Sequence, residues 1–269
     1  LMMQCLREQP RLFALGLGGH ETPLARMLKA LRWTGVTVPM HARLVRPGRV
    51  LRQAPAIRRT RLRRIGANLL GWSGLASLGM GLWDVVSGAR MARKQSSYSA
   101  VESATLGPWA DALWHRVRDR YDFLAARDTL TVEALMPKSS DLIRLRVRLG
   151  SEDVGWVSVV RHDFSIGAPD RHLGGLHVGV VADALAAPEH ARGTLGAALR
   201  TLEGKGVDLV FTNQLHAAWF EPLQDFGLMN VPSNFALYAS PTAAARAGDW
   251  HEAHVNRGDC DGPIWYADG

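Results

Sequence analysis

Short apolar runs alternate along the chain with stretches in which apolar residues recur at helical spacing. The run at residues 11–19 is apolar and ends in glycines, which is typical of a buried strand. Residues 22–35 then carry apolar side chains at helical spacing, with Thr22 as a candidate cap and Pro23 in the first turn. Residues 36–47 predict a second strand. This first part therefore reads as strand, helix, strand.

The same alternation continues through the second half of the chain. The pattern predicts a helix at 108–127, two strands joined by a turn near 150–153, a strand at 174–188, a helix at 189–206, a strand at 207–213, and a final helix and strand ending at 240. Two strands joined through a helix lie parallel in the same sheet, whereas strands joined by a tight turn lie antiparallel. We therefore expect an α/β or α+β fold with a mixed central sheet flanked by helices.

The first segment follows the same plan as the last one. Residues 11–47 and 207–240 share their order of elements, and Val38-Pro39 matches Val231-Pro232 at the start of the final strand. We interpret residues 11–47 as a partial copy of the later unit; chance similarity is the alternative. The predicted organisation is a partial first domain at 1–56, a connector at 57–107, a main domain at 108–245 and a tail at 246–269.

The predicted connector has an unusual composition. Residues 65–83 are uncharged over nineteen positions, a length that can just span a membrane. Five glycines and two serines within them favour helices packed between domains instead. Residues 93–107 are rich in polar and small side chains and predict a linker.

Charge is distributed unevenly over the sequence. The net charge is +7, and the stretch from Thr22 to Trp83 contains twelve Lys or Arg and no Asp or Glu. Such a stretch attracts phosphates, acidic proteins, nucleic acid or anionic lipid, or else it is a solvated linker. We expect an acidic partner at residues 43–64; nucleic acid is disfavoured because interleaved aromatic residues are lacking. Cys5 and Cys260 form neither a disulfide framework nor a metal cluster, so we expect a reducing, cytoplasmic location and no metal site.

One segment of the second half carries a more specific signal. The strand at 207–213 ends in Asn213, a helix follows, and Gly227-Leu228 precedes the last strand. Together with the element Ala187 to Leu199, these residues resemble the C-terminal half of the GNAT superfamily of acyl-CoA N-acyltransferases, with a tandem arrangement that has a truncated first domain. In such a fold two neighbouring parallel strands diverge, an exposed amide holds the thioester oxygen, and a helix start holds the pyrophosphate.

The resemblance implies a function and a set of site residues. The function would be transfer of an acyl group from acyl-CoA, acetyl-CoA or a carrier-bound thioester to an amine or hydroxyl acceptor. The donor would be held by Val180, Ala182, Pro188, Arg192, Gly193, Thr194 and Gly196, and the reacting centre would be formed by Asn213, His177, His216 and Asp183. Glu133 is a second candidate base beside Asp183, and either carboxylate could instead be solvated.

The sequence departs from the family pattern in two places, which leaves an alternative open. Aligned from Pro188, Ala191 stands where the phosphate loop usually has arginine; a one-residue slip puts Arg192-Gly193 in register, but Leu195 and Ala197 then stand at its other small-residue positions. Phe220 stands where many members have a tyrosine acid. The chain could therefore be a non-catalytic GNAT-like binding or regulatory module, in cell-envelope or polysaccharide assembly for example. Asn213 could equally cap the following helix. The tail after residue 245 predicts an ordered loop covering the cleft, anchored by Trp250 and Trp265.

Overall fold

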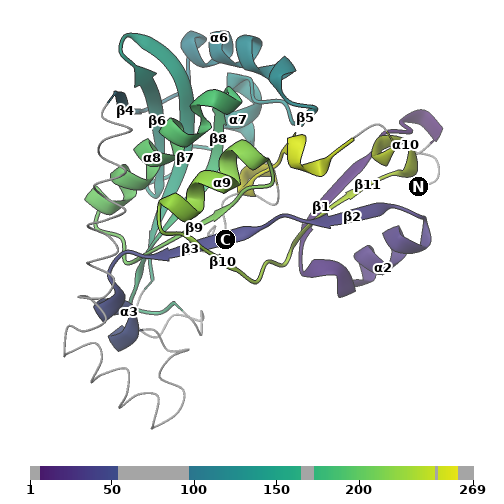
Figure 1. Cartoon of the computed structure of the whole chain (residues 1–269), viewed down its shortest axis with the longest axis horizontal. Coiled ribbons are helices and arrows are strands. Elements are labelled where there is room, and N and C mark those ends of the chain that lie inside the picture. The colour runs from purple at the N-terminus through teal and green to yellow at the C-terminus, as the bar shows by residue number, and fades with distance from the viewer. Residues whose placement is uncertain (1–6, 54–96, 165–172, 246–247, 260–269) are drawn as a thin grey trace.

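A seven-stranded sheet forms the centre of the molecule (Figure 1). The structure is a computed structural model that describes residues 7–53, 97–164, 173–245 and 248–259. The strand order in this large sheet is β10 (Met229–Val231), β3 (Met40–Leu44), β9 (Leu209–Asn213), β8 (His177–Ala186), β7 (Glu152–Asp163), β6 (Leu142–Leu149) and β4 (Tyr98–Ser103). Only β8 and β9 run parallel; all other neighbours are antiparallel. The predicted mixed sheet is confirmed.

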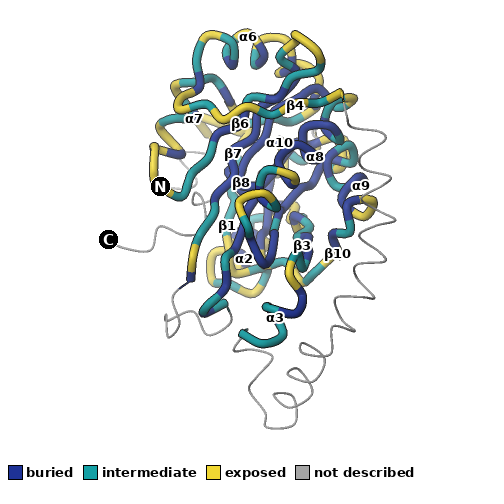
Figure 2. The backbone as a smooth tube through the Cα atoms, turned by 90° about the vertical axis from the view of Figure 1, so that its left-hand side faces the viewer, coloured by how far each residue is buried: buried dark blue, intermediate teal, exposed yellow. Residues whose placement is uncertain are grey.

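Helices cover both faces of the large sheet, as the fold class predicts. They are α6 (Pro108–Val117) and α7 (Thr129–Leu135) on one face, and α8 (Pro188–Gly204) and α9 (Ala217–Asp225) on the other. Pro188 occupies the first turn of α8, where its missing N–H costs nothing. Gly155 lets α8 approach β7 closely, because a Cβ there would lie 2.6 Å from Oγ1 of Thr194. The core lies between these layers, and Figure 2 shows β7 and β8 as a buried band.

A three-stranded sheet stands beside the large one. Its order is β1 (Phe13–Leu17), β11 (Phe235–Ala239) and β2 (Thr34–Thr37), all antiparallel, with α2 (Pro23–Ala30) packed against it. The remaining elements are α3 (Pro47–Gln53), η2 (Arg118–Arg120), β5 (Phe123–Leu124), α10 (Pro241–Ala244), β12 (Ala253–His254) and the short 3-10 turns η1 (Gly19–Glu21), η3 (Trp250–Glu252) and η4 (Arg257–Asp259).

Two segments with the same order of elements, residues 13–44 and 209–239, exchange their last strands. The order β1–α2–β2–β3 matches β9–α9–β10–β11, yet β3 lies between β9 and β10, and β11 lies between β1 and β2. The registers agree as well: Met40, the first residue of β3, faces Asn213, and Phe235, the first residue of β11, faces Leu17. Each central strand therefore comes from the other unit. That the chain is a tandem protein with a truncated first domain, and its domain boundaries, stay predictions.

The helices α2 and α9 end in the same way. The amide of Trp33 donates to Leu28 O at 3.0 Å, and the amide of Leu228 donates to Leu223 O at 2.9 Å. Between these residues the chain takes a left-handed conformation, with φ of 74° at Gly227 and 62° at Arg32. Glycine suits this position, whereas arginine is strained there.

Several sequence expectations need correction. Residues 93–107 were expected to be a linker, but residues 98–103 form the edge strand β4. The expected helix at 108–127 ends at Val117 and is followed by η2 and β5, because polar and aromatic residues interrupt its apolar face. The expected strand at 36–47 is two strands that belong to different sheets, since Pro39 cannot donate within a ladder.

The apolar segment at 65–83 lies outside the described residues. None of the helices that the structure describes is both long and apolar enough to cross a membrane.

The described arginines of the basic stretch are used inside the molecule. Arg43 Nη1 lies 2.5 Å from Glu203 Oε1, and Arg46 Nη1 donates to Gly206 O at 2.8 Å. Arg49 Nε lies 3.4 Å from an oxygen of the buried carboxylate of Asp208. The acidic partner predicted for residues 43–64 therefore has no support from these three side chains, and residues 54–64 lie outside the described part.

Candidate functional site

Strands β8 and β9 diverge, as the resemblance implies for two neighbouring parallel strands, but only beyond Val181. They pair from Val178 opposite Leu209 to Val181 opposite Thr212, after which β9 ends while β8 continues to Ala186. The segment of β8 beyond Val181 keeps its pairing with β7 but has lost β9. We call the space between the diverging ends the fork.

Aromatic side chains fill the fork. His254 Nε2 lies 2.8 Å from Ala184 O, and the hydroxyl of Tyr121 donates to Ala186 O at 2.6 Å. Trp219 Nε1 in turn donates to the Tyr121 hydroxyl at 2.8 Å. The ring of His254 lies between the other two, with centroids 4.8 Å from Tyr121 and 4.9 Å from Trp219. The prediction of an open gap is therefore wrong, because these side chains lie in the fork and hydrogen-bond two backbone carbonyls of β8 there.

His254 belongs to a segment that enters the fork from the C-terminal side. We call Ala253–Asp259 the wedge. Its backbone continues the missing pairing, because Leu215 N donates to Val255 O at 3.0 Å and Gln214 bridges Asn256. Gly258 lies so close to β8 that a Cβ there would be 2.7 Å from that of Asp183. The tail was expected to cover the cleft; its described part lies inside the cleft and has the role of a missing strand.

A buried charge network fixes the wedge to the sheet. Arg127 Nε lies 2.9 Å from Asp183 Oδ1, and Arg127 Nη2 lies 2.7 Å from Asp259 Oδ2. The side chain of Arg127 is 2% exposed, and those of the two carboxylates are 6% and 9% exposed. Asn256 Nδ2 also donates to Asp183 Oδ1 at 2.7 Å. Removing the shared cation alone would leave two buried carboxylates without a counter-charge, which is strongly destabilising.

Burial shifts the titration of the groups around the wedge. Burial raises the pKa of Asp259, while the nearby Arg127 guanidinium opposes this shift. The pKa of His254 lies well below its ordinary value because the ring is fully buried and Arg127 is close. Burial also lowers the pKa of His216, against the opposing effect of Glu252. Both imidazoles are therefore neutral at pH 7.

The predicted reacting centre does not assemble as expected. Asn213 lies at the fork, where its Nδ2 is 3.3 Å from Pro39 O and its Oδ1 accepts from Arg257 at 3.4 Å. It caps no helix; the cap of α9 is His216, whose Nδ1 accepts from Ala218 N. Asn213 thus connects β9 to the exchanged strand β3.

His177 lies at the opposite end of β8, far from Asn213. Its Nδ1 is 2.6 Å from Asp163 Oδ1, and its Nε2 is 3.0 Å from an Arg49 nitrogen. The expectation that His177 and Asn213 line one centre is wrong, because β8 enters the sheet at His177 and reaches the fork only after Val181.

The start of α8 is not arranged as a phosphate loop. Glu189 in the first turn has its pKa lowered, first by its own backbone amide, and Arg120 binds both its oxygens at 3.1 Å. Arg192 turns away to Asp225 at 2.7 Å. Gly193 accommodates the ring of Tyr98, since a Cβ there would lie 2.4 Å from ring atoms. A carboxylate rather than an anion site therefore occupies this helix end.

The remaining predicted residues are structural in their surroundings. Val180, Ala182, Thr194 and Gly196 are buried, Pro188 opens α8, and Glu133 Oε1 accepts from Leu106 N at 3.0 Å. Sequence reasoning missed Tyr121, Arg127 and Asn256. The sequence indicated these three residues only indirectly, because each is a polar or aromatic residue next to an apolar segment. In the described ranges no group of three His, Cys, Asp or Glu side chains could hold a metal ion.

Comparisons with known proteins find similar chains among solved structures alone. No family model and no curated protein matches the chain. Among solved structures it is similar to a GCN5-related N-acetyltransferase from Anabaena variabilis, at 9% identity and a TM-score of 0.44, over 88% of this chain and 48% of that one. It is also similar to the ribosomal-protein-S18-alanine N-acetyltransferase from Escherichia coli, at 13% identity and a TM-score of 0.33, over 52% of this chain and 92% of that one. The chain thus spans about half the length of the Anabaena protein.

Proposed function

We propose that the chain is a GNAT-like module whose fork is closed by its own wedge, and that it acts by binding rather than by transferring an acyl group through this fork. One observation carries the proposal: Ala184 O and Ala186 O already accept hydrogen bonds from His254 and Tyr121. A pantetheine arm needs such acceptors and the space beside them. A role in cell-envelope or polysaccharide assembly stays a prediction.

The energetics of opening support the closed module. A thioester could enter only after the wedge leaves, which separates Asp259 from the buried Arg127. Breaking a buried ion pair costs about 3–5 kcal/mol. Each 1.4 kcal/mol is a factor of ten in affinity, so this cost alone would weaken thioester binding by roughly two to four orders of magnitude. Loss of the aromatic contacts of His254 adds to it.

Acyl transfer from acyl-CoA, acetyl-CoA or a carrier-bound thioester is the second candidate. One observation favours it: β8 and β9 do diverge beyond Val181. In this candidate the wedge is a gate that the donor displaces. The acceptor would be an amine or a hydroxyl, as the sequence resemblance implies.

Thermal unfolding with thioesters separates the two candidates. The full chain is heated alone and with 1 mM coenzyme A, acetyl-CoA or a long-chain acyl-CoA. The closed module predicts no shift. A donor present at 100 times its dissociation constant would stabilise the protein by about 2.7 kcal/mol, which is roughly 5–11 °C for a domain of this size.

Hydrogen exchange of the wedge is the accompanying measurement. Under the second candidate, acetyl-CoA makes the amides of residues 253–259 exchange faster, because the segment leaves the fork. Under the closed module, these amides stay protected with and without the thioester. A thermal shift together with faster exchange of the wedge would overturn the closed-module proposal.

A further inference from the structure

A second region of the molecule has the features of a binding site. A cavity of about 650 Å³ lies where β4 and β7 end and β6 begins. This is the edge of the large sheet at which β8 starts, opposite the fork. Its volume is in the range of small-molecule sites. The site is independent of the fork and of any acyl transfer there.

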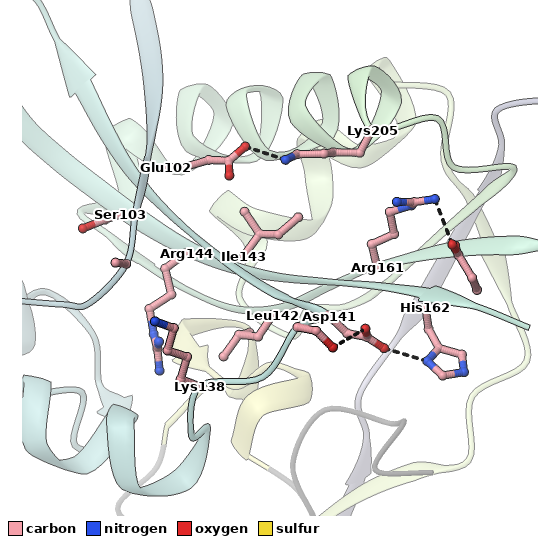
Figure 3. A pocket seen from close by; sticks show the side chains of 13 residues that line it. Glu102, Ser103, Lys138, Asp141, Leu142, Ile143, Arg144, Arg161, His162 and Lys205 are labelled. Atoms are coloured by element: carbon pink, nitrogen blue, oxygen red, sulfur yellow. Dashed lines mark hydrogen bonds and ion pairs between the residues drawn. The ribbon is translucent and has the colours of Figure 1, made fainter. Parts of the chain in front are cut away.

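Most charges on the cavity wall are compensated within the protein. Lys205 Nζ lies 2.8 Å from Glu102, and His162 Nδ1 lies 2.8 Å from Asp141. Arg161, also on the wall, pairs with a neighbouring carboxylate of β7 at 3.0 Å. Figure 3 shows Glu102 with Lys205 at the top of the view and Asp141 with His162 below, apart from Arg144 and Lys138 at the lower left.

Arg144, also on the cavity wall, is not compensated in this way. Its side chain is 5% exposed, its Nη2 donates to Met136 O at 2.6 Å, and its Nε is buried without a hydrogen-bond partner. In the described ranges no carboxylate forms an ion pair with it. Lys138, a second cation, lines the same wall in Figure 3. A buried guanidinium without a counter-charge is costly.

We propose that Arg144 and Lys138 form the anion subsite of a small-molecule binding site in this cavity. The ligand carries an oxyanion, a carboxylate or a phosphate ester, that accepts from the guanidinium of Arg144 and from the ammonium of Lys138. The planar guanidinium has N–H donors at fixed positions that match the oxygens of a carboxylate or phosphate. Lys138 adds a positive charge on a flexible side chain at the rim. The cavity beyond the subsite accommodates the rest of the molecule. The oxyanion thereby supplies the counter-charge that the fold leaves out.

Calorimetric titration of the full chain tests the subsite. The probes are inorganic phosphate and, separately, succinate, at constant ionic strength and pH 7.5. We expect saturable one-to-one binding of at least one probe. R144Q should weaken it about 10- to 100-fold, since a hydrogen bond to a charged group contributes 1.5–3 kcal/mol. K138Q should weaken it a few-fold, and R144K should retain part of the affinity.

The controls keep a folding defect apart from a binding defect. Arg118 is an exposed arginine outside the cavity, so R118Q should bind the probes as the unaltered protein does. Lys138 is on an exposed loop, so K138Q keeps the fold even if R144Q does not. Absence of saturable binding by both probes would overturn the proposal, as would equal affinity in R144Q, K138Q and R118Q.

Discussion

Replacing Arg127 with methionine tests whether the wedge is fixed by one shared cation. The substitution keeps much of the side-chain volume but leaves Asp183 and Asp259 buried with no counter-charge. Removing one partner of a buried pair typically costs 3–5 kcal/mol. For a domain of this size that lowers the unfolding temperature by roughly 6–20 °C. Urea unfolding followed by tryptophan fluorescence measures the free energy, because Trp219 touches the wedge through His254.

Two further variants show whether charge is the cause. The triple variant R127M/D183N/D259N removes both carboxylates and should recover at least half of the loss. R120M removes an arginine that is 51% exposed and should cost less than about 1 kcal/mol. Burial raises the pKa of Asp259, and R127M removes the guanidinium that opposes this shift. The stability lost in R127M relative to the unaltered protein should therefore shrink as pH falls from 7 to 5. A loss below about 1 kcal/mol in R127M, or a triple variant no more stable than R127M, would refute the reasoning.

Three more predictions concern single positions. In the unfolded chain the imidazole of His254 takes up a proton near pH 6.5, whereas burial prevents this in the folded protein. The free energy of unfolding in urea should therefore fall below that pH, by up to about 1.4 kcal/mol per pH unit. The same dependence of stability on pH in H254Q would contradict this. R32G should raise the free energy of unfolding by about 0.5–1 kcal/mol, because glycine adopts the left-handed conformation of this position without strain, whereas G227A should lower it. A lower urea midpoint in R32G would argue against the matched ends of the two helices. G193A should lower the free energy of unfolding by about 1–3 kcal/mol, because the added Cβ displaces the ring of Tyr98 in β4. The added Cβ of G204A meets nothing within 4 Å, so this variant should be neutral or stabilising. Equal urea midpoints for the two variants would count against the close contact of Gly193 with Tyr98.

The sequence predicts the alternating architecture well because periodicity is a local property. The strand β8, the helix α8 and the parallel pairing of β8 with β9 follow from apolar spacing and chain order alone. The edge strand β4 was missed because its residues 98–103 are half polar and partly exposed, as edge strands often are. The exchange of β3 and β11 was also missed, since a strand's pattern does not say which neighbour it will pair with.

The candidate site was predictable only in part. Asn213 and the divergence of its strand from β8 follow from the sequence, but what fills the divergence does not. The wedge begins more than thirty residues after Asn213, and Arg127 more than eighty residues before it. Contacts at such separation depend on tertiary packing. The buried Arg144 was likewise hidden, because Arg144, Arg146 and Arg148 alternate along β6 as a solvated face would.

The exchange of β3 and β11 decides how the protein can be dissected. A polypeptide starting at residue 97 would carry β9 and β10 without the strand that joins them, and β11 would have neither of its partners. A polypeptide ending at residue 53 would lack the middle of its only sheet. Neither piece should therefore be expressed alone as a surrogate for a domain. Mixed together, the two pieces should instead complement each other, like the halves of a split reporter.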